Sequence, residues 1–160
     1  MRKTRVFGKV VNENPIALEI YTEQKRLEAE ANSLEEELKE NEIKLRSMNH
    51  KYATNRYIPE NDQTPPYADP YIYVYPSDEI RMKEITEREA FYNTHCAPLE
   101  KRIDELWEKV WALREELCVA LWGYGEKRYR LEVNLKEAEK ELAEATARVN
   151  ALRAELAEME

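Results

Sequence analysis

Apolar residues recur at alternating intervals of three and four positions along the last part of the chain. In a helix such positions share one face, and this alternation is typical of the contact face of a coiled coil. The pattern predicts a helix over residues 126–160 that packs through this face. The face consists of Leu135, Ala138, Leu142, Ala145, Val149, Leu152, Leu156 and Met159.

Two earlier stretches repeat the pattern. The first runs from Ile20 to Met48 and predicts a helix over 14–52, with Asn14 as its N-cap and Pro15 in its first turn. The second runs from Met82 to Ala120 and predicts a helix over 77–122. Its N-cap is Ser77, which two acidic residues follow.

Two polar or helix-breaking residues fall within these patterns. Asn41 occupies a contact position of the first helix, where it either fixes the register of helix pairing or is solvated at a break. Pro98 lies inside the second helix. The helix either kinks there or ends near Asn93 and restarts with Pro98 in its first turn.

The remaining segments lie outside the predicted helices and are expected to be non-helical. Residues 1–13 form a β-like arm that contains RVFGKVV, and residues 53–76 form a loop rich in tyrosine and proline. The prolines of this loop exclude a continuous helix, and its YIYVY segment alternates like a strand. Pairing of YIYVY with RVFGKVV would make a two-stranded patch. A turn at Gly123–Gly125 predicts a helical hairpin.

Together these elements predict a mainly all-α protein, with one elongated helical domain over residues 1–160. We expect an antiparallel three-helix bundle or coiled coil with a long Tyr/Pro-rich loop, and a small two-stranded β patch remains open. Charged residues make up 36% of the chain and glycine occurs 3 times. Both values favour long helices that expose much of their circumference to water.

Aromatic and acidic residues supply the candidate partner-binding sites. The loop tyrosines either bind a partner or pack on the helices. The tryptophans form a second apolar stripe on the middle helix, which either lies in the bundle core or binds a partner. The acidic residues of the first helix are candidates for contact with a basic protein. These candidates are Tyr67, Tyr71, Tyr73, Tyr75, Trp107, Trp111, Trp122, Glu35, Glu36 and Glu37.

Motifs for catalysis, cofactors or metals are absent from the sequence. The two histidines, His50 and His95, have no CxxC or HxxxH spacing beside them, and no phosphate-binding glycine loop or GxSxG occurs. We therefore expect no enzyme, no cofactor and no metal site. The chain has no apolar run as long as a membrane span, and its first residues lack the apolar core of a signal peptide. We expect a cytoplasmic protein.

The net charge of −8 disfavours direct binding to nucleic acid. A basic pole around Arg128 and Arg130 is thus the weakest hypothesis. The first hypothesis is a scaffold or assembly module that acts by protein–protein contact, with self-association to a homo-oligomer as one option. The alternative is a small acidic inhibitor that blocks a basic nucleic-acid-processing protein. Phage and mobile-element inhibitors such as anti-CRISPR proteins have a similar size and charge.

Overall fold

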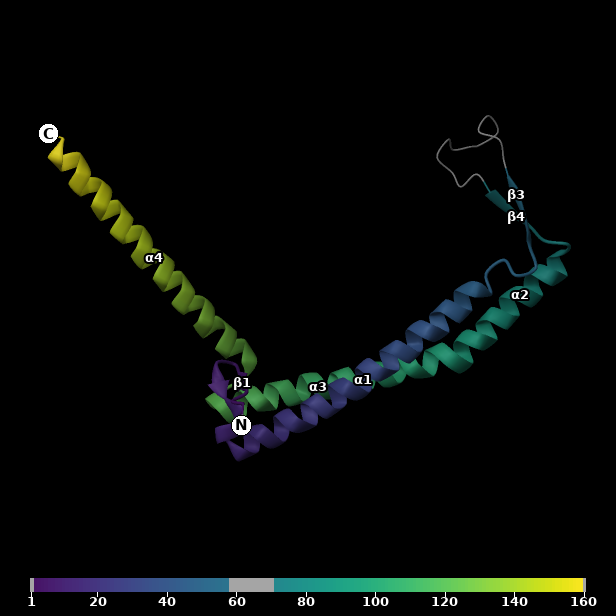
Figure 1. Cartoon of the computed structure of the whole chain (residues 1–160), viewed down its shortest axis with the longest axis horizontal. Coiled ribbons are helices and arrows are strands. Elements are labelled where there is room, and N and C mark those ends of the chain that lie inside the picture. Colours follow the sequence, from purple (N-terminus) through teal and green to yellow (C-terminus); the bar gives the residue numbers. More distant parts are fainter. Residues whose placement is uncertain (1, 58–70, 160) are drawn as a thin grey trace. The chain divides into compact units, whose positions relative to one another are not determined.

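The computed structural model describes residues 2–57 and 71–159, and most of these residues are helical (Figure 1). The mainly all-α class is confirmed, with three long helices and small two-stranded sheets beside them. In chain order the elements are β1 (Arg5–Val6), β2 (Lys9–Val10), the 3-10 turn η1 (Val11–Glu13), α1 (Pro15–Ser47), β3 (Thr54–Tyr57), β4 (Tyr71–Val74), α2 (Asp78–Phe91), the π-helical segment η3 (Tyr92–Cys96), α3 (Ala97–Trp122) and α4 (Glu126–Glu158).

The chain divides into two compact units. The terminal unit comprises Met1–Arg26 and Lys109–Glu160, and the central unit comprises Leu27–Glu108. Helices α1 and α3 each contribute to both units. Each unit therefore combines segments that lie far apart in the sequence.

The terminal unit is held by a small apolar core under the N-terminal hairpin. The fully buried members of this core are Val11, Ala17 and Leu117, and Leu121 joins them. Asn14 caps α1, because its Oδ1 accepts a hydrogen bond from the Ala17 N–H at 3.0 Å, as its sequence position predicts. Its Nδ2 also donates to the Ala120 carbonyl at 3.2 Å. The start of α1 is therefore attached to the end of α3.

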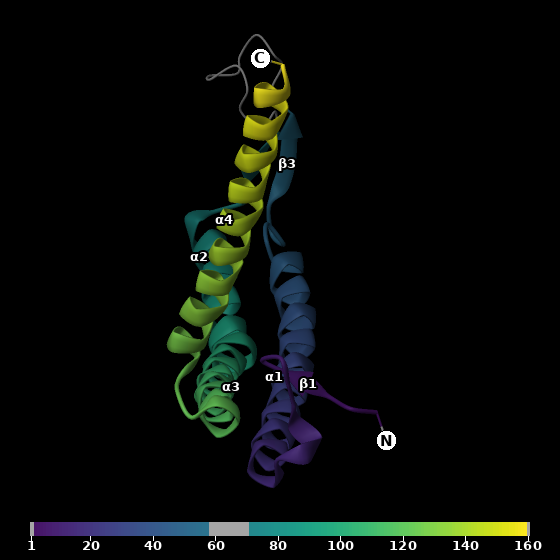
Figure 2. The same cartoon turned by 90° about the vertical axis from the view of Figure 1, so that its left-hand side faces the viewer.

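In the central unit, α1 runs antiparallel to the helices that follow it (Figure 2). Glu30 pairs with Arg102 at 2.9 Å, and Asn41 Nδ2 donates to the His95 carbonyl at 2.9 Å. The partner number falls as the α1 number rises, which defines the antiparallel direction. Asn41 is half-buried and bonds to backbone. It is thus neither paired with another side-chain amide nor simply solvated.

The chain remains helical past Pro98 by forming a wider turn. The Ala97 N–H bonds to the Tyr92 carbonyl, five residues back, which is the bond of a π-helix. α3 then begins at Ala97, so Pro98 lies in its first turn. Since proline cannot donate a backbone hydrogen bond, an irregular turn just before it is one of the recognised ways to accommodate it.

Each strand pairs antiparallel with the next strand along the chain. β1 pairs with β2, and the intervening Phe7 and Gly8 have φ values of 49° and 76°. β3 pairs with β4, with Thr54 opposite Val74. Small two-stranded patches are therefore present, but YIYVY does not pair with RVFGKVV, the option that the sequence left open. Both pairings join segments that are close in the sequence, and closing a short loop costs less entropy than closing the long loop between YIYVY and RVFGKVV.

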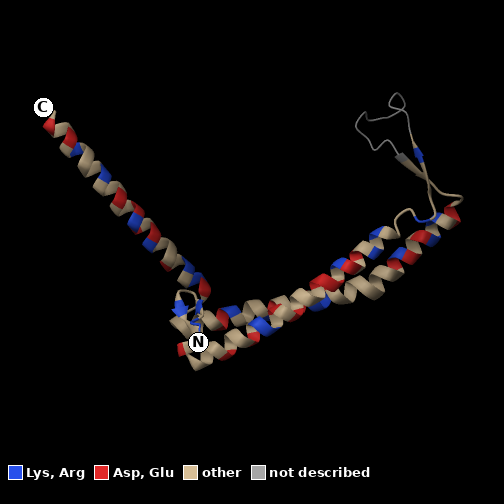
Figure 3. Ribbon diagram, in the orientation of Figure 1, with Lys and Arg blue, Asp and Glu red and all other residues tan. Residues whose placement is uncertain are grey.

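Helix α4 contributes no buried residue. The apolar face that the sequence predicts is present, but the structure leaves it exposed, with Leu142 68% and Leu156 63% accessible. The charged residues of both signs are distributed along the length of α4 (Figure 3). In the described part of the chain, no helix combines the length and apolar character needed to cross a membrane.

Candidate functional site

A group of polar side chains surrounds Glu84 where the chain turns from α1 to α2. We call His50, Tyr52, Tyr73, Tyr75 and Glu84 the tip cluster. Glu84 is 2% exposed. Its Oε2 accepts a hydrogen bond from the Tyr75 hydroxyl at 2.6 Å, and its Oε1 accepts one from the Tyr52 N–H at 3.1 Å. Tyr75, one of the predicted partner-binding tyrosines, is therefore hydrogen-bonded to a buried carboxylate.

Local backbone features place these side chains. α1 ends at Ser47, and His50 then adopts φ 57°, a left-handed conformation that reverses the chain. On the other side, Ser77 Oγ accepts a hydrogen bond from the Ile80 N–H at 3.3 Å and so caps α2 as predicted. Glu84 lies two turns into α2 and faces the reversed chain.

His50 links the two tyrosines of the tip cluster. Its ring stacks on the Tyr73 ring with centroids 3.5 Å apart, and its Nδ1 lies 3.1 Å from the Tyr75 hydroxyl. Because that hydroxyl donates its one hydrogen to Glu84, it acts as the acceptor toward Nδ1. The resulting chain of hydrogen bonds runs from His50 through Tyr75 to Glu84.

The pKa values follow from these contacts. Burial by itself raises the pKa of Glu84, but hydrogen bonds from Tyr75 and the backbone of Tyr52 and His50 favour the charged form and leave it below the ordinary value. The same bond raises the pKa of Tyr75, because loss of its proton would leave two negative groups in contact. Glu84 is therefore ionised at neutral pH and its oxygens are engaged in holding the turn.

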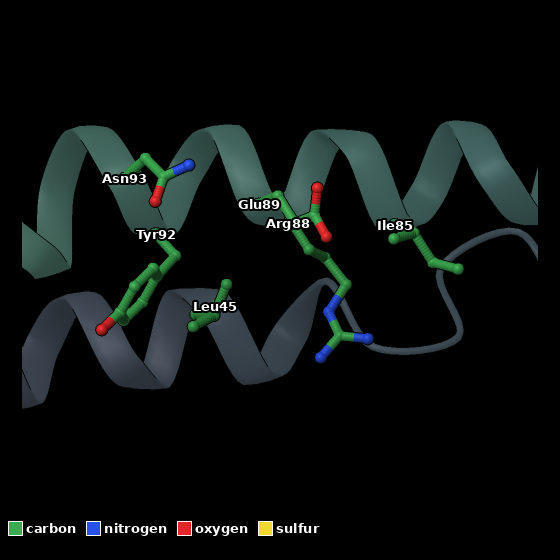
Figure 4. A pocket seen from close by; sticks show the side chains of 6 residues that line it. All are labelled: Leu45, Ile85, Arg88, Glu89, Tyr92 and Asn93. Atoms are coloured by element: carbon green, nitrogen blue, oxygen red, sulfur yellow. The ribbon is translucent and has the colours of Figure 1, made fainter.

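An open pocket of ≈ 480 Å³ borders the tip cluster. Arg81 and Arg88 lie on its α2 side together with Ile85. A second pocket of ≈ 360 Å³ shares Ile85 and Arg88 and also includes Leu45 and Tyr92 (Figure 4). Figure 4 shows the Arg88 side chain reaching from α2 toward the α1 side. Its Nε is buried and makes no hydrogen bond.

Acidification should test the role of Glu84. A carboxylate whose pKa is lowered in the folded state contributes stability above its unfolded pKa and loses that contribution as the pH falls through the folded value. The thermal midpoint of the wild type should therefore fall more steeply than that of Glu84→Gln between about pH 5 and pH 3. Other carboxylates with lowered pKa, such as Glu126, act equally in both proteins. Parallel pH curves would contradict this role of Glu84.

The three tryptophans of the predicted stripe have different environments. Trp107 is half-buried and its Nε1 donates to Glu35 at 2.8 Å. Trp122 is half-buried and donates to the Phe7 carbonyl at 3.1 Å. Trp111 is 60% exposed. Trp122 thus attaches the N-terminal hairpin to α3, whereas Trp111 presents most of its ring to solvent.

The acidic and tyrosine candidates are also divided. Glu35 is half-buried and accepts the bond from Trp107, whereas Glu36 and Glu37 are exposed. Tyr67 lies outside the described residues, and Tyr71 is described only as backbone of β4. Among the described candidates of the central unit, Tyr73 and Tyr75 both contact His50, and Glu35 contacts Trp107.

The basic residues near the chain turn at Gly125 are paired with acids of the same unit. Arg130 pairs with Glu126 at 2.5 Å, and Arg128 pairs with Glu132 at 3.1 Å. Glu132 also accepts a hydrogen bond from Tyr124. These contacts offset the positive charge of the basic pole considered from the sequence.

Sequence reasoning did not single out Glu84, His50 or Arg88 as members of a site. Glu84 sits among other acids and bases of α2, and nothing in the local pattern marks it as buried. The alternation of YIYVY was the available signal, since it places Tyr71, Tyr73 and Tyr75 on one side of a strand.

Comparisons with protein-family models, with curated proteins and with solved structures give no match. Among residues 2–57 and 71–159, no group of three or more His, Cys, Asp or Glu side chains is arranged to hold a metal ion. Cys96 and Cys118 are both buried and free, and burial raises the pKa of both thiols.

Proposed function

We propose that this chain is a non-catalytic coiled-coil protein that acts by protein–protein contact, as an assembly module. The observation that carries the proposal is the exposed apolar face of α4. We define the α4 face as Leu131, Leu135, Ala138, Leu142, Ala145, Val149, Leu152 and Leu156, and all of these residues are exposed.

The regularity of the α4 face is what supports binding rather than chance exposure. Scattered single apolar residues are normal on a protein surface, but a continuous stripe at helical spacing is typical of an interaction surface. Full burial of a leucine side chain stabilises a complex by about 1.5–3 kcal/mol. Burial of several leucines of one stripe would therefore favour association of this helix with a partner.

A pair of matched variants tests the proposal. Leu142→Glu with Leu152→Glu places charge within the α4 face, whereas Ala147→Glu with Ala154→Glu adds the same charge on the opposite side of the helix. We expect the first variant to lose self-association or partner capture, and the second to retain it. Sedimentation velocity and affinity capture from the native host measure these outcomes. Equal behaviour of both variants and the wild type would contradict the proposal.

The cytoplasm is the proposed setting, because buried unpaired cysteines are typical of reducing compartments. The inhibitor hypothesis stays a prediction. Of its three acidic residues, Glu36 and Glu37 are exposed and available to a basic partner, while Glu35 is engaged with Trp107.

A further inference from the structure

The residues beside the α4 face carry a charge pattern that selects a helix orientation. In heptad notation, Leu135, Leu142, Val149 and Leu156 are a positions, and the interleaved residues are d positions. The flanking positions are Glu132, Glu139, Thr146 and Arg153 on the e side, and Asn134, Glu141, Arg148 and Glu155 on the g side. In coiled coils such flanking residues set the partner and the direction of pairing.

A parallel pair of α4 helices would place like charges together. In that arrangement a g residue meets the e residue five positions later on the other helix. Arg148 would face the partner's Arg153, and Glu141 would face the partner's Thr146. The parallel in-register pair therefore gains no attraction from these flanks and includes repulsion.

An antiparallel pair reverses this balance, because g then meets g and e meets e. One register places Leu135 opposite the partner's Leu152 and Leu156 opposite the partner's Leu131. In this register Glu141 faces the partner's Arg148, and the symmetry of the pair makes this contact twice. Arg153 lies between the partner's Glu132 and Glu139. The nearest charged pairs, Glu141 with the partner's Arg148 and Arg153 with the partner's Glu132, are then of opposite sign, and the like-charge approach of the two Glu141 side chains lies farther away.

The side-chain sizes agree with the same register. At its centre Leu142 faces the partner's Ala145, and Val149 faces the partner's Ala138. A large residue meets a small one, so the helices interdigitate without voids or overlap. A shift by one heptad would place Leu135 opposite the partner's Met159. It would also bring Glu141 toward the partner's Glu155 and Arg148 toward the partner's Arg148.

We infer that α4 pairs antiparallel with α4 of a second copy of this chain, in the register that joins Glu141 to the partner's Arg148. The inference rests on the proposed function, because it names the partner of the same α4 face. The paired region from Leu131 to Leu156 is about 38 Å long at a rise of 1.5 Å per residue.

Charge reversal of the full-length chain distinguishes the two orientations. Arg148→Glu should weaken the antiparallel dimer about 10-fold, since two attractive contacts become repulsive. Adding Glu141→Arg to that variant should restore the wild-type dissociation constant. In a parallel dimer, Arg148→Glu would instead strengthen association, because it would face the partner's Arg153. Analytical ultracentrifugation at low and high salt measures the change.

Disulfide trapping reads the register directly. A mixture of Leu131→Cys and Leu156→Cys chains should form a mixed disulfide, because these residues face each other in the inferred register. Leu156→Cys alone should form no dimeric disulfide. The wild type, with its buried Cys96 and Cys118, serves as the control for background cross-linking.

The outcomes separate the inference from the proposed function. A disulfide dimer of Leu156→Cys alone would overturn the antiparallel register and leave the proposed function standing. A monomeric wild type that captures another protein through the α4 face would likewise overturn the pairing of two α4 helices and leave the proposed function standing. A monomer that binds nothing and whose α4 amides are protected from hydrogen exchange would show α4 folded on its own chain, and would overturn both.

Discussion

Replacement of Trp122 by alanine should destabilise the terminal unit by about 3 kcal/mol. The indole packs on the core formed by Val11, Ala17, Leu117 and Leu121, and its Nε1 holds the Phe7 carbonyl. Lys9 adds to this contact, since its Nζ lies 4.1 Å from the ring centroid. The change removes apolar burial and leaves the hairpin without its anchor. Thermal unfolding gives the loss of stability, and hydrogen exchange at β1 and β2 shows whether the hairpin detaches.

Trp111→Ala is the matched control on the same helix. Because Trp111 is 60% exposed, its removal should cost less than about 1 kcal/mol. It should also leave exchange in the hairpin unchanged. If both variants lost equal stability, the distinction between a structural and a surface tryptophan would be wrong. If Trp111→Ala reduced capture of a partner without a change in stability, Trp111 would belong to an interaction surface.

Replacement of Glu84 by leucine should destabilise the central unit by about 2 kcal/mol. Leucine has a similar volume but cannot accept the hydrogen bonds from the Tyr75 hydroxyl and the Tyr52 N–H. The tip cluster would then contain donors without acceptors, and the stacking of His50 on Tyr73 would lose its support. Chemical denaturation measures the stability, and the His50 and Tyr73 ring signals in NMR spectra report on the stacking.

Glu89→Leu provides the comparison within α2. Glu89 is exposed and lines the pocket beside Arg88, so its replacement should change stability by no more than about 0.5 kcal/mol. An equal loss in the two variants would mean that the loss follows from removing any acid from α2, and the special role of the buried Glu84 would be rejected.

Helix positions followed from the sequence because they depend on local chemistry. The spacing of apolar residues, the caps at Asn14 and Ser77 and the turn near Gly125 each act within a few residues. The apolar face of α4 could also be predicted from the spacing of its residues, since it is a property of one helix. The class of the fold was therefore available before the structure.

The contacts between distant segments were decided only by the tertiary structure. A strand pattern does not specify its partner, so YIYVY paired with β3 rather than with the N-terminal arm. Burial likewise depends on what faces a residue. Glu84 became a buried acceptor because the reversed chain at His50 brings Tyr52 and Tyr75 to it, and Trp122 became an anchor because Phe7 lies beside it. The sequence determined which faces are apolar, and the fold determined which of these faces are covered and which remain exposed.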